Sequence, residues 1–136
     1  GRTIYSYGRH FPISVIDAND SNIVYFTTDR YSNTTAKHIS AVLHAISHKN
    51  IIYCKNPDQA GIGVHSANLE DFNGKCKNIA ENFLRNARKP EIYLNQIAGQ
   101  RRMFLEYCTH FKIKKSVQNK YKYIWIESQD GGIKAN

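Results

Sequence analysis

Two histidines, His44 and His48, stand four residues apart in the sequence HAISH, the spacing at which two imidazoles on one helical face can share a zinc ion. A zinc protease carries a glutamate general base directly after the first histidine, and alanine stands there instead. The sequence offers no obvious third ligand. We therefore expect no metal and interpret the pair, with Lys37, as the solvent-facing side of a helix. A stripe that faces a polyanion, joined by Lys49, is the alternative.

Arg9 and His10, near Tyr7 and Tyr31, suit a different chemistry, the metal-independent cleavage of a phosphodiester with His10 as general acid or base. Nothing in the sequence brings a second acid or base beside His10. The segment QAGIGVH lacks the lysine of a P-loop and the third glycine of a dinucleotide fingerprint, so we interpret its glycines as loop flexibility. We expect a chain without catalytic activity or a cofactor, and His10 is the catalytic candidate.

The net charge of +8 is concentrated in one stretch of the chain. From Arg85 to Lys122 there are ten basic and two acidic residues, which gives +8, while the rest of the chain balances nine basic against nine acidic residues. A positive excess confined to one stretch indicates a polyanionic partner more strongly than a high pI does. The ten basic residues are Arg85, Arg88, Lys89, Arg101, Arg102, Lys112, Lys114, Lys115, Lys120 and Lys122.

Aromatic residues alternate with lysines at the end of this stretch, in KYKYIWI. Basic side chains can contact phosphates while Tyr121, Tyr123 or Trp125 stack on bases. A solvated cationic face above core aromatics is the alternative interpretation. We expect a surface that binds DNA or RNA, made of Arg101, Arg102, Lys112, Lys114, Lys115, Lys120, Lys122, Tyr121 and Tyr123.

Period-two patterns and turn residues predict the strands that accompany these candidates. Residues 3–16 are rich in β-branched and aromatic side chains and predict one strand or two short ones, with Pro12 at an edge or a bulge. DANDSN, residues 17–22, is typical of a turn, so the following strand, NIVYFTTD, closes a hairpin. IIYC, residues 51–54, predicts a short buried strand, and YKYIWIE, residues 121–127, alternates like a strand.

Apolar residues at spacings of three and four predict three helices. The first covers residues 33–48, and the second starts at Ser66 or Asn68. Pro90 suits the first turn of the third helix, which runs to about Phe111. The expected buried stripes are Ile39, Val42, Leu43 and Ile46; Leu69, Phe72, Cys76, Ile79 and Phe83; and Leu94, Ile97, Phe104, Cys108 and Phe111.

The order of these elements predicts an α+β fold. We expect a small, mostly antiparallel sheet, made of the N-terminal hairpin plus two further strands and packed by about three helices. Residues 55–65 are expected to form a loop. At 136 residues the chain is expected to be a single domain, residues 1–136, in which residues 129–136 form a frayed tail.

Cysteine usage and hydropathy predict the compartment. Cys54, Cys76 and Cys108 are odd in number, form no CxxC pair and fall on apolar stripes, which favours buried, reduced thiols in a cytoplasmic protein. No apolar run approaches the roughly 18 residues of a membrane span, so we expect no membrane partner.

Two N-terminal stretches, YSYGRHFPISV (residues 5–15) and TTDRYSNTTAKHISAV (residues 27–42), resemble small domains encoded by phages and mobile elements. The shared patterns are Y-G-x-H-F-P and R-Y-S-x-T-T-x-K-H, and the resemblance implies no activity. At the start of a helix such residues can hold a phosphate oxygen or a carboxylate, although helix capping alone also explains them. Besides Tyr7 and His10, the resemblance draws attention to a polar patch of Arg30, Tyr31, Ser32, Thr34, Thr35, Lys37 and His38.

These observations give three hypotheses of different classes. The first is a non-catalytic, cytoplasmic nucleic-acid-binding protein of phage or mobile-element type. The second, which the resemblance implies, is an anti-defence inhibitor of the anti-CRISPR kind that binds a host defence protein or blocks its nucleic-acid channel. The third is a small metal-independent nuclease that uses His10. The sequence leaves the oligomeric state open.

Overall fold

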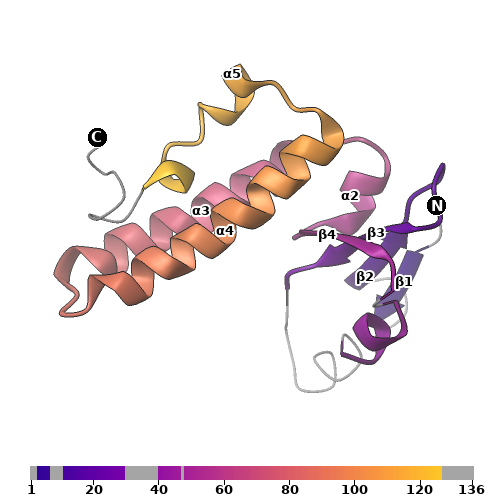
Figure 1. Ribbon diagram of the computed structural model, residues 1–136, viewed down its shortest axis with the longest axis horizontal. Helices are drawn as coiled ribbons and strands as arrows, with labels where there is room; N and C mark the ends of the chain where they lie inside the picture. The colour runs from indigo at the N-terminus through magenta and orange to yellow at the C-terminus, as the bar shows by residue number, and fades with distance from the viewer. Residues whose placement is uncertain (1–2, 7–10, 30–39, 47, 127–136) are drawn as a thin grey trace. The chain divides into compact units, whose positions relative to one another are not determined.

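The computed structural model describes residues 3–6, 11–29, 40–46 and 48–126 (Figure 1). The chain forms two compact units, residues 1–68 and 69–136. The first contains a β-sheet with short helices, and the second is built of helices, so the α+β class expected from the sequence is confirmed. The expected tail at residues 129–136 lies outside the described residues.

Four strands form the sheet of the first unit, in the order β1-β2-β3-β4. β1 (Thr3–Ser6), β2 (Phe11–Ile16) and β3 (Ile23–Thr27) form an antiparallel meander. β4 (Asn50–Cys54) pairs with β3 in parallel. A parallel pair needs a crossover connection, and the chain between β3 and β4 contains a helix at residues 40–45. The mostly antiparallel sheet is confirmed, and the strand expected over residues 51–54 belongs to it.

Pro12 lies in β2 opposite Tyr5, at the point where the register between β1 and β2 shifts. Proline has no N–H to donate to a ladder, and a bulge is one of the few places where a sheet accommodates it. Because β2 lies between β1 and β3, Pro12 is not on an edge strand. Pro12 was expected at a sheet edge or at a bulge, and the structure places it at the bulge.

The turn between β2 and β3 is organised by Asp17. Its Oδ2 accepts hydrogen bonds from the backbone N–H groups of Asn19 (2.9 Å) and Asp20 (3.0 Å), the local pattern that favours Asp in turns. Its Oδ1 accepts a hydrogen bond from the hydroxyl of Tyr25 at 2.5 Å. The turn expected from DANDSN is therefore confirmed, and Tyr25 anchors it to β3.

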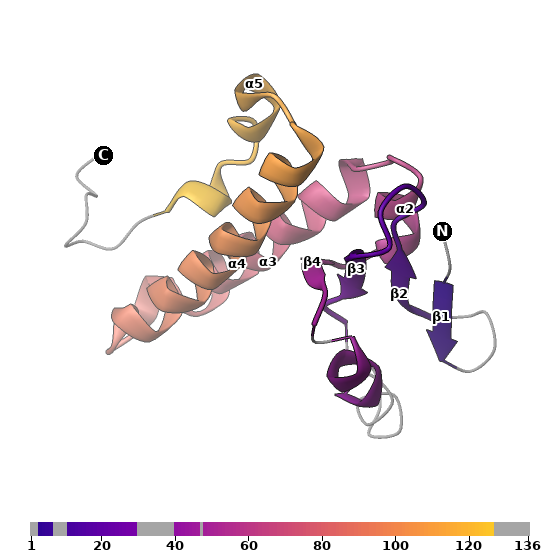
Figure 2. The ribbon, with the colours of Figure 1, turned by 45° about the vertical axis from the view of Figure 1, so that its right-hand side comes forward.

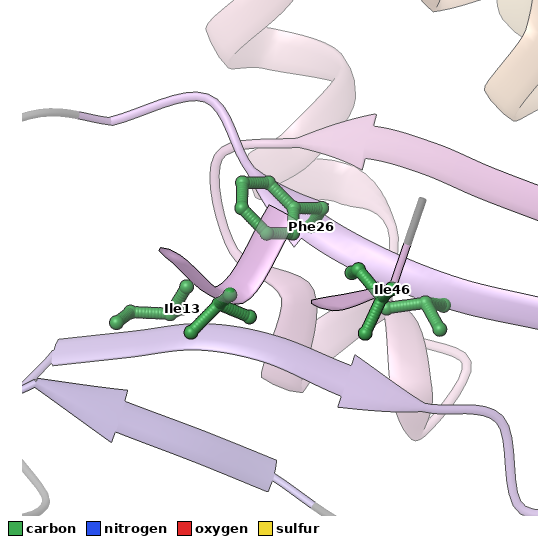
Figure 3. Close-up of a cluster of buried hydrophobic side chains, with 5 residues drawn as sticks. Ile13, Phe26 and Ile46 are labelled. Carbon is green, nitrogen blue, oxygen red and sulfur yellow. The ribbon is translucent and has the colours of Figure 1, made fainter. Parts of the chain in front are cut away.

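The core of the first unit contains side chains from the sheet and from the helix at residues 40–45 (Figure 3). Ile13 of β2 and Phe26 of β3 lie close to Ile46, which directly follows that helix. Val24 and Val42 complete this buried cluster. Val42, Leu43 and Ile46 of the apolar stripe predicted for the first helix therefore face the sheet, as amphipathic packing requires, and Ile39 lies outside the described residues.

The helix expected over residues 33–48 is described from residue 40 and ends at residue 45, earlier than expected. The N–H of Ile46 donates to the carbonyls of Val42 (3.0 Å) and Leu43 (3.3 Å), a tightened last turn. β4 then begins at Asn50, and a helix that continued to residue 48 would leave too few residues for the turn into it. His48 consequently lies in this turn and not on the helix.

Residues 55–65, expected to form a loop, contain a short helix, α2 (Pro57–Gly61). Pro57 stands in its first turn, where a missing N–H has little cost. A Cβ atom at Gly61 would lie 2.8 Å from Cγ1 of Val15, so α2 approaches β2 closely. Gly63 has a φ of +78°, in the left-handed region that glycine tolerates. The interpretation of these glycines as loop flexibility is therefore wrong, because they allow close packing and a turn.

Two glycine-to-alanine substitutions are expected to change stability in opposite directions. Gly61→Ala forces a methyl group against buried Val15 and lowers the free energy of unfolding by about 1–2 kcal/mol. Gly74→Ala, at an exposed helical position with open space around it, raises the free energy of unfolding by about 0.5–1 kcal/mol. Urea unfolding of both variants measures the difference. Equal stabilisation by both would contradict the close approach of α2 to β2.

Two long helices, α3 (Ser66–Asn82) and α4 (Pro90–Phe111), form a hairpin that makes up most of the second unit (Figures 1 and 2). The turn between them contains η1 (Leu84–Asn86). Both helices were expected, and α4 has the predicted bounds. Aromatic rings pack edge to face between the helices, with Phe72 and Phe104 at a centroid distance of 6.0 Å. In the described part of the chain, no helix combines the length and the apolar character needed to cross a bilayer.

After α4 the chain forms the four-residue helix α5 (Lys115–Gln118) and then the 3-10 turn η2 (Tyr123–Trp125). The prediction of a strand over residues 121–127 is therefore wrong for residues 121–126, the part that the structure describes. The N–H of Tyr123 donates to Oδ1 of Asn73 at 2.9 Å. Nη1 of Arg101 donates to the carbonyls of Ile124 (3.1 Å) and Ile126 (2.9 Å). Side chains of α3 and α4 thereby satisfy backbone groups that a neighbouring strand would otherwise pair.

Candidate nucleic-acid interface

Nine of the ten basic residues between Arg85 and Lys122 are exposed, and Arg101 is half-buried. None of the nine forms an ion pair with a carboxylate of the described residues, whereas Lys75 of α3 pairs with Asp71 at 3.0 Å. Positive charges without a neutralising neighbour raise the electrostatic potential of the surrounding solvent and attract anions. The second unit therefore presents a cationic surface.

The nine exposed residues are spread along the α3–α4 hairpin. Arg85, Arg88 and Lys89, here called the turn cluster, lie in the turn between the helices. Lys89 and Lys112 flank α4, whose 22 residues span about 33 Å at the usual rise per residue. A stretch that is continuous in sequence is thus spread over the length of the hairpin, with the turn cluster at one end, Arg102 within α4 and Lys112 at the other end (Figure 2). A single small anion cannot contact both ends.

Five exposed lysines, here called the α5 lysines, lie in the segment that leaves the end of α4 and returns along the hairpin to η2. Lys112 ends α4 in the left-handed conformation, with a φ of 56°. Lys114 directly precedes α5, and the ammonium of Lys115 lies 6.0 Å from the ring centroid of Trp125. The full set is Lys112, Lys114, Lys115, Lys120 and Lys122. The structure thus places five of the seven predicted basic residues on one short segment.

The aromatic residues expected to stack on bases hold this segment on the helices. Tyr121 and Trp125 are half-buried and contact Phe104 edge to face, at centroid distances of 6.1 Å each. Nε1 of Trp125 donates to the carbonyl of Gln118 at 3.3 Å. The hydroxyl of Tyr123 donates to Glu81 at 3.0 Å. These contacts favour the interpretation of the aromatics as packing residues, and base stacking by Tyr121 and Tyr123 stays a prediction.

Two tyrosine hydroxyls have raised pKa values for different reasons. Burial is the main cause that raises the pKa of Tyr121, with Glu70 adding to it. The hydrogen bond to Glu81 is the main cause that raises the pKa of Tyr123. Both phenols are therefore neutral at physiological pH, so neither adds negative charge beside the α5 lysines.

Arg101 and Arg102 were expected to act alike, and the structure separates them. Arg101 is half-buried and its guanidinium donates two hydrogen bonds to the backbone of residues 124–126. Arg102 is exposed on the next position of α4. Because Nη1 of Arg101 holds the backbone of this segment, Arg101 contributes to the fold, whereas exposed Arg102 is the stronger candidate for the interface.

The turn between α3 and α4 also contains residues that the sequence pattern misplaced. Phe83 was expected in the buried stripe of the second helix, but α3 ends at Asn82 and Phe83 is 47% exposed. Its ring stacks on that of Tyr93, with centroids 5.6 Å apart and an interplanar angle of 12°. Together with Arg88 and Lys89 these rings line a hollow of about 510 Å³. The break in helical periodicity at RNARKP is the feature that could have indicated it.

The other candidates lie in the N-terminal part of the chain. Residues 7–10 and 30–39 are outside the described residues, so the geometry of the catalytic candidate and of the polar patch is not part of the described structure. His44, on the helix at residues 40–45, and His48, in the following turn, are both exposed, as the solvent-facing interpretation predicts. Among the described residues, no three His, Cys, Asp or Glu side chains gather in a way that could hold a metal ion.

The three cysteines are buried and free, as expected. Burial raises the pKa of Cys76 and that of Cys108 from the usual 9.0 to about 11 in each case. A thiol that is not ionised at neutral pH is a poor nucleophile, so neither residue supports covalent chemistry.

The raised pKa values predict a pH dependence of stability. Above pH 9 the unfolded chain releases thiol protons that the folded chain keeps, so the free energy of unfolding falls as the pH rises from about 9 to about 11. Urea unfolding between pH 7 and pH 11 measures this loss. A Cys76→Ala and Cys108→Ala double variant is the control and should lose less stability over the same range. An identical loss in the double variant would contradict the assignment to these thiols.

Comparison with protein-family models, with curated proteins and with solved structures finds no match to this chain. The phage and mobile-element origin therefore stays a prediction. The charge and geometry of the second unit are the observations from which a function can be inferred.

Proposed function

We propose that this chain is a non-catalytic nucleic-acid-binding protein whose second unit contacts phosphate groups. The observation that carries the proposal is the set of nine exposed basic residues without an ion-pair partner among the described carboxylates. Lysine and arginine side chains are among the groups that contact phosphates in protein–nucleic-acid complexes, and they neutralise the charge of these phosphates. The α5 lysines are the centre of the interface, and Arg102 and the turn cluster extend it.

The spread of the charge favours a long polyanion over a small one. Lys89 and Lys112 are separated by the length of α4, about 33 Å. Phosphates follow one another at roughly 3.4 Å along each strand of a duplex, so this length corresponds to about ten base pairs. A nucleic acid can therefore contact both ends of the hairpin at once, whereas a nucleotide or an inorganic phosphate cannot.

Fluorescence anisotropy with labelled single- and double-stranded oligonucleotides tests the proposal. We expect binding at low salt that weakens steeply as salt is added, because each phosphate contact releases condensed counterions. The oligonucleotides should also remain intact after incubation without added metal, whereas cleavage that is lost in His10→Ala would support the nuclease hypothesis instead.

The absence of binding to DNA and RNA at low salt would contradict the proposal. In that case the charge would serve a protein partner, and isolation of a complex with a purified defence protein would support the inhibitor hypothesis. The two hypotheses therefore differ in whether the chain binds nucleic acid alone.

A further inference from the structure

The hollow in the α3–α4 turn combines aromatic surface with positive charge. Phe83, Ile92 and Tyr93 provide its apolar surface, and Arg88 and Lys89 provide its charge. Its volume of about 510 Å³ lies within the range of roughly 300–1,000 Å³ that is usual for small-molecule sites. Every lining residue belongs to the segment 82–93, so the hollow is formed within the second unit.

The apolar part of the hollow is unusually open to solvent. Phe83 is 47% exposed and Ile92 is 52% exposed, although both are large apolar residues. Tyr93 covers one side of the Phe83 ring in a parallel stack, and nearly half of Phe83 stays accessible. Aromatic and apolar side chains in this state form a platform on which another flat ring can lie.

The positive charge beside this apolar platform favours a ring that is linked to a phosphate group. Arg88 and Lys89 line the hollow, and Arg85 lies in the same turn, whereas no acidic residue lines it. The guanidinium and ammonium groups match a phosphate, and an apolar peptide or a lipid chain would gain nothing from them. The amide of Asn86, also in the lining, can donate to or accept from the edge of a base.

We propose that this hollow binds an unpaired nucleobase of a single strand, with the base on Phe83 and Ile92 and the adjoining phosphate at Arg88 and Lys89. The inference rests on the proposed function and adds strand preference to it. A base inside a duplex is stacked on both sides and cannot reach the platform, whereas a single strand can place a base there.

The test uses a single-stranded 12-mer with one 2-aminopurine and the duplex of the same sequence. Phe83→Leu removes the ring but keeps an apolar side chain, and Phe83→Tyr restores the ring. We expect Phe83→Leu to weaken single-strand binding about 10-fold and to leave duplex binding within about twofold of the wild type. The quenching of 2-aminopurine fluorescence that is expected on binding to the wild type should disappear in Phe83→Leu. Phe83→Tyr should behave like the wild type. An Arg88→Gln and Lys89→Gln double variant should weaken single-strand binding, and Lys75→Gln, which removes a charge that already pairs with Asp71, serves as the charge control.

The outcomes separate this inference from the proposed function. If the wild type binds neither oligonucleotide, both fail. If it binds and Phe83→Leu loses less than about threefold in single-strand affinity, or loses duplex affinity equally, the hollow is not a base site and only this inference fails. The helical circular dichroism signal of Phe83→Leu, compared with that of Phe83→Tyr, checks that the hairpin is folded. Trp125 lies in η2 outside the hollow, so its fluorescence reports on the α5 segment in the same titration.

Discussion

Replacement of the five α5 lysines by glutamine is expected to weaken binding to a DNA duplex at about 50 mM salt by at least roughly 1,000-fold. The slope of the logarithm of the binding constant against the logarithm of the salt concentration should decrease in magnitude by about 4 to 5, because up to five phosphate contacts disappear. All five side chains are exposed, so the fold should persist. Anisotropy titrations at several salt concentrations measure both quantities.

The matched control replaces the same five lysines by arginine. It keeps the charge and should bind the duplex at least as tightly as the wild type, because guanidinium groups also contact phosphates. A second control, Lys75→Gln, removes one charge of α3 that already pairs with Asp71 and is not among the nine residues of the proposed interface. If the glutamine variant keeps the wild-type affinity and salt slope, the α5 lysines do not contact phosphates.

The substitution Arg101→Gln is expected to lower the free energy of unfolding by about 2 kcal/mol. Nη1 of Arg101 donates to the carbonyls of Ile124 and Ile126, and a shorter, neutral glutamine cannot replace these charge-assisted bonds. Removal of the guanidinium should release η2 and expose Phe104, which Tyr121 and Trp125 cover. Urea unfolding gives the loss in stability, and Trp125 fluorescence reports the release of the segment.

The neighbouring substitution Arg102→Gln provides the contrast. Arg102 is exposed and makes no described ion pair, so its replacement should change the unfolding free energy by less than about 0.5 kcal/mol. It should instead weaken oligonucleotide binding by a few-fold, as expected for one phosphate contact. Equal effects of the two substitutions on stability would contradict the structural role of Arg101.

The long periodic elements of the fold could be predicted from the sequence. The stripe that contains Ile97, Phe104 and Cys108 predicts α4, and these three residues are buried in the structure. The segment at residues 121–127 could not be predicted in the same way, because alternation over seven residues does not distinguish a strand from a chain that lies across two helices. Its conformation depends on Asn73 and Arg101, which are distant in sequence.

The candidate site was predictable in its charge but not in its shape. The excess of basic residues between Arg85 and Lys122 is visible in the sequence, but the helical hairpin distributes these residues over its whole length. The pattern also placed Phe83 on a buried stripe, since it continues the spacing of Leu69, Phe72 and Cys76. The helix ends one residue before Phe83, and this local event creates the hollow.

Titration of the isotope-labelled chain with an oligonucleotide, followed by NMR of the backbone amides, tests the central claim most directly. We expect the largest shift changes at residues 112–122 and at the turn cluster, residues 85–89, with additional changes at Phe83, Ile92 and Tyr93 when the oligonucleotide is single-stranded. The amides of the sheet, at residues 11–27 and 50–54, should change little. Shift changes confined to the sheet, or no changes at saturating oligonucleotide, would contradict the assignment of nucleic-acid binding to the basic surface of the helical hairpin.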